Sequence, residues 1–364
     1  MKLLGNATIQ KFIIIITILF SGCGENTSDE IHTNVQPKIE LIPELIISDS
    51  DNLILSQITE IKTDSKGRIY LNDQRALRIH VYKSDGTYLS SIGQEGSGPG
   101  EFQRLTNILI DYRDRLVTID SRLARNTIFF EKNGYWSVDQ IFHIEGNGFY
   151  AIESIAPDEK VVLKKMLFKM PEPPGVYWQE SELALGHLST GLIQDEIDQF
   201  KSLAMLINND GGLIVKPFGR TTLMDTTPDG KVFMVWNDKF NVNIFDSSLN
   251  LIDSLSVPIP NQLVTNEERT ELINTMGDMF RSIGRKYLPD TKPVIKNMIV
   301  DKSENYWLQT YDKPEYLVLN KNGFTVGSFD LQSDMQLAHI DKDRIYVIQS
   351  NDKGYNVHVF RYEL

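Results

Sequence analysis

The sequence contains a single cysteine, Cys23, among its 364 residues. A chain with one cysteine forms no internal disulfide and has no cysteine set for a zinc site. Its six histidines show no HxH or HxxxH spacing of the kind that indicates a metal centre. No cofactor motif is found. Stability must therefore come from packing, and a chain of this length can bury a large core.

Positive charge is also scarce. The chain has 37 Lys and Arg residues against 49 Asp and Glu residues, which gives a net charge of −12. Nucleic-acid binding depends on neutralising phosphates with basic side chains. The composition therefore predicts that nucleic acid is not a partner.

The chain also lacks an apolar run long enough to cross a membrane. The run Phe12–Phe20 has nine residues, whereas a spanning helix needs about 20. Lys2 and Lys11 precede it, and Ser21-Gly22-Cys23 follows it, which resembles a bacterial lipobox. We predict a signal peptide over residues 1–22 and a lipid-bearing Cys23. A plain signal peptide with an incidental cysteine is the alternative.

This prediction places the mature chain in the bacterial cell envelope, lipid-anchored at the outer membrane and facing the periplasm or the surface. Loss of residues 1–22 removes two lysines and no acid, which leaves 35 basic and 49 acidic residues and a net charge of −14. Residues 23–38 are polar and acidic, and we expect them to form a flexible tether.

The segment 58–102 shows the pattern around which the rest of the chain is organised. Four short apolar runs are separated by turn signals rich in Gly, Asn and Asp. Such a pattern predicts two hairpins. Four antiparallel strands in about 45 residues match one blade of a β-propeller.

The segment's first turn contains an aspartate followed by an apolar strand, and this marker recurs along the chain. It is found at six positions: Asp64, Asp111, Asp158, Asp229, Asp301 and Asp341. The intervals are 47, 47, 71, 72 and 40 residues. The sequence therefore predicts an all-β, six-bladed propeller over residues 39–364, with insertions near 170–212 and 258–293.

The sixth repeat ends at Leu364 after three strands. The strand-like segment Ile39–Ser48 precedes the first blade and belongs to no repeat. We predict that it supplies the missing fourth strand, because this closure joins the chain ends and removes an exposed edge.

The second insertion has a helical pattern near residues 265–288. Thr265 and Glu268 form a capping box. One apolar stripe follows, made of Leu272, Ile273, Met276, Met279, Phe280 and Ile283. The sequence predicts one helix that packs on the propeller rim; a lid or a partner-binding helix is the alternative. The first insertion is ambiguous between strand and helix.

Basic residues recur in the loops between second and third strands. Asp73-x-Arg75-x-x-Arg78 and Asp120-x-Arg122-x-x-Arg125 share one spacing. The candidate ligand-binding residues are Arg75, Arg78, Arg122, Arg125, Lys239, Lys313 and Lys353. In a closed ring these loops lie on one face, where cations would bind an anionic small molecule, a glycan or a protein. Alternatively, each basic residue pairs with a nearby acid and is structural.

The motif around Asp73–Gly86, with Arg78-Ile79 and a closing glycine, is similar to the NHL repeat. The junction Gly93–Phe102, which reads GQEGSGPGEF, resembles the linker between NHL blades. With the lipobox and the six repeats, the chain resembles the six-bladed propeller lipoproteins of Bacteroidetes. This resemblance implies a fold and an envelope location. Six-bladed relatives also include calcium-dependent lactonases and related hydrolases, which act in the central channel.

The sequence therefore supports two functions. The first is an envelope-anchored scaffold that binds a ligand or a partner, and catalytic residues are unknown. The second is a propeller hydrolase or lyase with a site in the central channel, with or without calcium. An enzyme is expected to gather several Asp, Asn, Glu or His side chains at one point of the channel.

Overall fold

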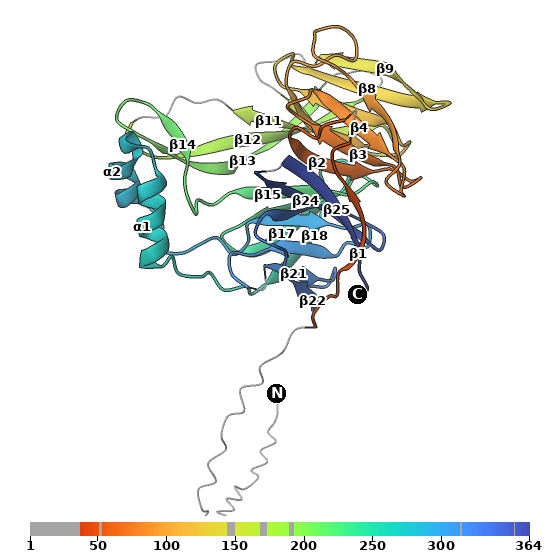
Figure 1. Ribbon diagram of the computed structural model, residues 1–364. Coiled ribbons are helices and arrows are strands. Elements are labelled where there is room, and N and C mark those ends of the chain that lie inside the picture. Colours follow the sequence, from red (N-terminus) through yellow and green to blue (C-terminus); the bar gives the residue numbers. More distant parts are fainter. Residues whose placement is uncertain are drawn as a thin grey trace, which may run out of the picture. The chain divides into compact units, whose positions relative to one another are not determined.

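The computed structural model describes residues 37–50, 53–143, 150–167, 173–188, 193–313, 315–352 and 354–364. These residues form six antiparallel sheets, five with four strands and one with five (Figure 1). Each sheet is one blade, and the first strands of all six blades line a single cavity. The predicted six-bladed propeller is confirmed.

The strands follow one another in chain order within each blade. Blade 1 consists of β2 (Ile58–Thr63), β3 (Ile69–Asp73), β4 (Arg78–Tyr82) and β5 (Tyr88–Ile92). Blade 2 consists of β6 (Leu105–Ile110), β7 (Leu116–Asp120), β8 (Arg125–Lys132) and β9 (Tyr135–His143). Blade 3 consists of β10 (Tyr150–Ile155), β11 (Lys160–Leu167), β12 (Gly175–His187), β13 (Ile193–Ile207) and β14 (Leu213–Val215).

The other three blades have four strands each. Blade 4 consists of β15 (Thr222–Thr226), β16 (Val232–Trp236), β17 (Phe240–Phe245) and β18 (Leu251–Val257). Blade 5 consists of β19 (Asn297–Val300), β20 (Tyr306–Gln309), β21 (Tyr316–Leu319) and β22 (Thr325–Phe329). Blade 6 consists of β23 (Met335–Asp341), β24 (Arg344–Asn351), β25 (Gly354–Arg361) and β1 (Ile42–Ile47).

The N-terminal strand closes the ring as predicted. β1 pairs antiparallel with β25, with Ile42 opposite Arg361 and Ile47 opposite Val357. Glu44 on β1 forms an ion pair with Arg361 at 3.0 Å. Two segments more than 300 residues apart are thereby joined in one sheet. Because a strand from each end completes blade 6, the ring has no blade that lacks its outer strand.

The apolar side chains form one core cluster at each of the six boundaries between adjacent blades. The cluster between blades 1 and 2, for example, contains Tyr70 and Val81 from one blade and Leu105 and Leu116 from the next, all four fully buried. Each buried Val, Leu or Ile contributes roughly 1.5–3 kcal/mol. No blade can bury these faces alone, so the ring forms as a unit.

The turn between first and second strands holds its aspartate through many hydrogen bonds. Asp64 accepts hydrogen bonds from the backbone N–H groups of Lys66 (3.0 Å) and Arg68 (2.9 Å), from the Tyr70 hydroxyl (3.0 Å) and from the Arg68 Nε (2.5 Å). Asp111 repeats the arrangement in blade 2. The repeat marker therefore stabilises the turn.

The marker is misplaced in two blades. In blade 3 the first residue of the equivalent turn is Ala156, and in blade 4 it is Thr227, as their backbone bonds to Lys160 and Lys231 show. Asp158 and Asp229 lie two residues further along each turn. The count of six survives because these aspartates occupy the same turn.

The glycine-rich junction connects β5 to β6. Its phenylalanine, Phe102, is fully buried and packs on Phe129, with ring centroids 6.3 Å apart. Gly93 has φ +86°, and a Cβ at this position would lie 2.1 Å from the Phe102 ring. Only glycine therefore fits beneath the ring, and the junction serves as a linker between blades.

The first insertion extends blade 3. β12 and β13 are 13 and 15 residues long, and β14 adds a fifth strand to the sheet. The second insertion contains two helices, α1 (Asn266–Thr275) and α2 (Asp278–Tyr287), beside this extension (Figure 1). Leu206 from β13 packs in one cluster with Phe280 and Ile283 from α2. The helices therefore pack on the elongated strands of blade 3.

The prediction of a single helix near 265–288 was wrong in one respect. The capping box forms, since Thr265 and Glu268 exchange hydrogen bonds of 3.1 and 3.0 Å. The helix then stops because Met276 adopts an extended conformation before Gly277. This break shifts the phase of the apolar stripe and leaves Met279 58% exposed. No helix among the described residues is both long and apolar enough to span a bilayer.

Candidate functional site

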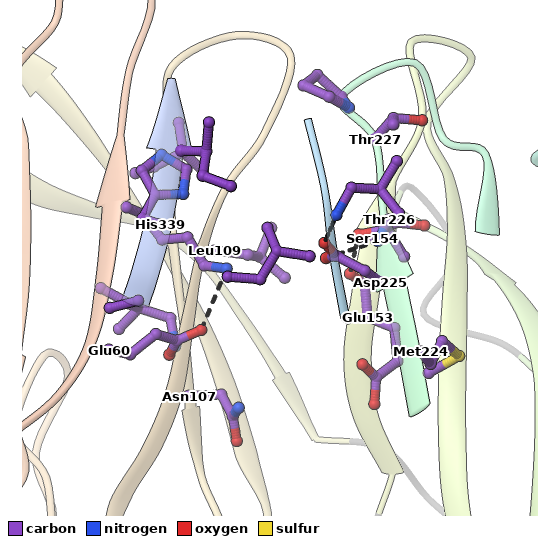
Figure 2. Close-up of a pocket in the computed structure, with 18 of the residues that line it drawn as sticks. Glu60, Asn107, Leu109, Glu153, Ser154, Met224, Asp225, Thr226, Thr227 and His339 are labelled. Carbon is purple, nitrogen blue, oxygen red and sulfur yellow. Dashed lines mark hydrogen bonds and ion pairs between the residues drawn. The ribbon is translucent and has the colours of Figure 1, made fainter. Parts of the chain in front are cut away.

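A cavity of about 530 Å³ lies on the ring axis. Its lining comes from β2, β6, β10, β15, β19 and β23, the first strand of each blade (Figure 2). Ligand sites of proteins are usually concave and carry a few convergent polar groups. The cavity is therefore the candidate site.

Six lining residues share one position of the repeat, two residues before the turn. Each lies opposite the second or third residue of the following strand, as Lys62 does opposite Tyr70. They form one ring of side chains: Lys62, Leu109, Ser154, Asp225, Ile299 and His339. Four of these six positions carry polar side chains, and other polar residues, such as Glu60, Asn107 and Glu153, also line the cavity.

Irregular pairing modifies the lining further. In β2, β6, β10 and β23 the register shifts by one residue, which is the geometry of a β-bulge. The bulged residues are Thr59, Thr106, Glu153 and Ala338, and all four line the cavity. Bulges re-aim side chains and are frequent beside active sites. In β10 the bulge adds a carboxylate, Glu153, to the lining.

Two glutamates of the cavity lie beside lysines. Glu60 is 3.3 Å from Lys62, and Glu153 is 3.8 Å from Lys164. Glu60 also accepts a hydrogen bond of 2.7 Å from the backbone N–H of Ile108 in the next blade (Figure 2). Each glutamate therefore has a cation within ion-pair distance.

Asp225 has a different environment. Its carboxylate accepts hydrogen bonds from the backbone N–H groups of Thr226 (2.9 Å) and Val300 (2.7 Å). No Lys or Arg in the described part of the chain forms an ion pair with it. Ser154, on the inner strand of blade 3, is 5% exposed, and its hydroxyl has no hydrogen-bond partner among the described residues. Blades 3 and 4 thus present an unpaired carboxylate and an unused hydroxyl.

Burial shifts the ionisation of all three acids. It raises the pKa of Glu60, of Glu153 and of Asp225, and the nearby lysines only partly oppose this effect. For Lys62, burial disfavours the ammonium, yet the surrounding carboxylates raise its pKa. Titratable groups perturbed in this way are concentrated at functional sites.

His339 adds a neutral polar group to the ring. Its Nε2 is 2.9 Å from the Thr63 hydroxyl. Burial, together with the charges of Lys62 and Lys302, lowers the pKa of His339 well below its usual value. The imidazole is therefore uncharged at neutral pH and can donate or accept a hydrogen bond.

The described residues contain no group of three or more His, Cys, Asp or Glu side chains close enough to hold a metal ion. The acids of the cavity project from different blades and remain separate.

The predicted basic residues lie away from this cavity, and none of those described contributes to its lining. Arg125 is buried and donates hydrogen bonds to the carbonyls of Ser97 and Glu101, so it fastens the glycine-rich junction. Lys313 forms an ion pair with Asp330 at 3.3 Å. These two side chains have structural partners.

The remaining candidates are exposed or outside the description. Arg75, Arg78, Arg122 and Lys239 are exposed and form no ion pair among the described residues. Lys353 and the predicted lipid-bearing Cys23 lie outside the described residues. An anionic partner at this rim stays a prediction.

Three tryptophans near the loops also have structural contacts. Trp307 is 1% exposed and donates a hydrogen bond of 2.9 Å to Asp301, which makes it structural. Trp178 and Trp236 are half-buried and contact each other, with ring centroids 5.5 Å apart. They connect the extension of blade 3 to blade 4.

Sequence reasoning missed the residues of the cavity. Glu60, Lys62 and Asp225 are absent from the candidate binding residues, which are all basic residues of the loops between second and third strands. The available signal was the repeat itself. Aligning the six turns and taking the residue two before each of them gives the ring of the cavity.

Three comparisons place the fold among known proteins. Residues 40–135 match the profile of a family described as a 6-bladed beta-propeller. An exported protein of Bacteroides fragilis superposes with a TM-score of 0.54 at 12% identity, over 92% of this chain and 98% of that one. A DUF4221 family member from Bacteroides vulgatus gives a TM-score of 0.53 at 10% identity, over 90% and 99%.

No curated protein matches the sequence. The structural likenesses are too low in sequence identity to show more than the fold. At the level of fold, the comparisons confirm the predicted resemblance to six-bladed propeller proteins of Bacteroidetes.

Proposed function

We propose that the chain is an exported, lipid-anchored binding protein whose ligand site is the central cavity. The observation that carries the proposal is the ring of polar side chains inside that cavity. Asp225, Ser154, Lys62 and His339 come from four different inner strands, and all four line the cavity. Placing charges in a buried cavity is costly for folding, so their presence favours a role in recognition.

Export is supported by two features. The N-terminal segment has the composition of a lipoprotein signal, with Ser21-Gly22 before Cys23. The Bacteroides fragilis protein of similar fold is described as exported. A lipid on Cys23 would hold the propeller at the envelope, and residues 24–38 would act as its tether.

The anchor is tested by Cys23→Ala. We expect the wild-type protein to sediment with membranes after a high-salt wash and the variant to appear in the soluble fraction, because no other lipid attachment site is present. Ser21→Ala, which keeps a small residue before the cysteine, is the matched control. A Cys23→Ala protein that still sediments would disprove the anchor.

The site is tested by equilibrium dialysis of the purified protein against polar small molecules extracted from the native envelope. Mass spectrometry compares the wild type with the variant Glu60→Gln/Glu153→Gln/Asp225→Asn. We expect the wild type to retain compounds that this variant does not retain. Thermal unfolding checks the fold, and the three single variants replace the triple one if it unfolds. Equal retention by all proteins would refute a binding site in the cavity.

A second candidate is a hydrolase or lyase that uses the same cavity. It is favoured by the raised pKa of the Glu60 and Glu153 carboxyls, which suits a general acid. The same dialysis distinguishes it. An enzyme consumes a compound and yields new masses, whereas a binding protein retains the compound unchanged.

A further inference from the structure

The charged groups in and around the cavity can be matched one by one. Three lysines face three carboxylates: Lys62 with Glu60 at 3.3 Å, Lys164 with Glu153 at 3.8 Å, and Lys302 with Asp341 at 2.6 Å. His339 is neutral. Asp225 is left over: no described Lys or Arg forms an ion pair with it, and the charge of Lys62 only partly offsets the effect of its burial.

Asp225 lines the cavity, and the backbone holds its carboxylate in place. Two backbone N–H groups hold the carboxylate at 2.7 and 2.9 Å, which fixes its orientation. Each carboxylate oxygen has further acceptor capacity. Burial raises the pKa of Asp225, so its ionised form lacks solvation that a cation would supply.

An independent observation concerns the neighbouring blade. The Ser154 hydroxyl is 95% buried, lines the cavity and has no hydrogen-bond partner among the described residues. The hydrogen bond from the Thr226 hydroxyl to the Glu153 carbonyl, 3.1 Å long, ties the two inner strands together beside it. Buried hydroxyls normally have a partner. Ser154 and Asp225 therefore lie on neighbouring inner strands and line the same cavity.

We propose that the ligand of the cavity presents an ammonium group, which binds between the Asp225 carboxylate and the Ser154 hydroxyl. This inference rests on the proposed function and names its ligand class: small polar amines such as amino sugars, amino alcohols and polyamines. The ammonium donates to Asp225 and to Ser154, and its charge balances the one acid that the lysines leave unpaired. The remaining polar groups of the ring, including His339, are available to hydroxyls of the ligand.

The test uses pairs of compounds that differ only in the amine. Glucosamine, ethanolamine and putrescine are titrated into the purified protein by calorimetry or ligand-observed NMR. Their counterparts are glucose, ethylene glycol and butane-1,4-diol. We expect each amine to bind at least about tenfold more tightly than its counterpart, the effect of one charge-assisted hydrogen bond.

The residues are tested by three variants. Asp225→Asn should weaken amine binding at least about tenfold. Asp85→Asn, which makes the same charge change at an exposed turn, should leave binding unaltered. Ser154→Ala removes a hydroxyl with no partner in the described structure and should weaken amine binding without lowering the melting temperature. This variant keeps the test valid if Asp225→Asn does not fold.

The outcomes separate this inference from the proposed function. Equal binding of amines and their counterparts would overturn the amine class while the cavity remains a binding site. An amine preference that persists in both Asp225→Asn and Ser154→Ala would overturn the assignment to these residues. Retention of only neutral or anionic compounds in the dialysis would also refute the inference. A cavity that retains nothing in the dialysis would refute the proposed function itself.

Discussion

The acids of the turns and the acids of the cavity are the same residue types in opposite environments. Asp64 in the first turn accepts four hydrogen bonds, one of them from the guanidinium of Arg68. Asp225 in the cavity accepts two, both from backbone N–H groups, and it has no arginine or lysine partner among the described residues. The first arrangement stabilises a fold, whereas the second leaves binding capacity unused.

This difference separates structural acids from candidate functional ones without reference to conservation. Asp64 is satisfied by residues within six positions of it in the sequence, so its role is complete once the hairpin forms. The cavity acids depend on other blades, as the bond from Val300 to Asp225 shows. A charge that the fold buries without satisfying locally is the better indicator of function.

The largest expected effect is the loss of stability when a turn aspartate is removed. Asp64→Ala should lower the free energy of unfolding by about 3 kcal/mol, because it leaves Arg68, 11% exposed, without its closest partner. Urea unfolding of the purified protein measures the change. Asp85→Ala, at an exposed turn, should cost clearly less. A loss for Asp64→Ala no larger than that of the control would show that the turn acids do not stabilise the ring.

The acids of the cavity should have a smaller effect, which is a pH dependence of the protein's stability. Burial raises the pKa of Glu153 above its usual 4.5, and Lys164 of β11, Glu60 and Lys62 of β2 and Asp225 of β15 act on it. The folded state then holds this proton longer than the unfolded state, so stability contributed by protonated Glu153 is lost as pH rises above about 4.5. Removing the charge should therefore stabilise the protein at neutral pH.

Glu153→Gln tests this sign. The variant should match the wild type near pH 4 and become more stable above it, by about 1 kcal/mol at pH 7. Thermal or urea unfolding at several pH values measures the difference. Glu363→Gln, at the exposed C-terminal end, should run parallel to the wild type. A Glu153→Gln variant that is less stable at pH 7 than at pH 4, relative to the wild type, would mean that the ion pair with Lys164 outweighs burial.

The basic loop residues show that a local spacing pattern can predict a hairpin without predicting the direction of its side chains. Arg122 and Arg125 belong to one motif. Arg122 lies in the turn between β7 and β8, and Arg125 is the first residue of β8. Arg122 is exposed, however, while Arg125 points into the glycine-rich junction and bonds to the Ser97 carbonyl at 3.0 Å. The spacing fixed the hairpin but not the direction of each side chain, because that direction depends on what the neighbouring segment offers.

The sequence by itself determined the repeat, the number of blades and the closing strand. These follow from local physics: alternating apolar residues form strands, Gly and Asp form turns, and a three-stranded sixth repeat requires a fourth strand, which β1 supplies. The helix break at Gly277 escaped prediction because a glycine in a helical pattern is tolerated or not according to its packing.

Only the tertiary structure decided which polar residues share the cavity. Lys62, Ser154, Asp225 and His339 lie as many as 277 residues apart and meet only when six inner strands surround one axis. Within its own strand, each reads as an ordinary solvent-facing residue. Ring closure converts that face into a cavity wall and removes most of its water, and this desolvation turns common side chains into a candidate binding site.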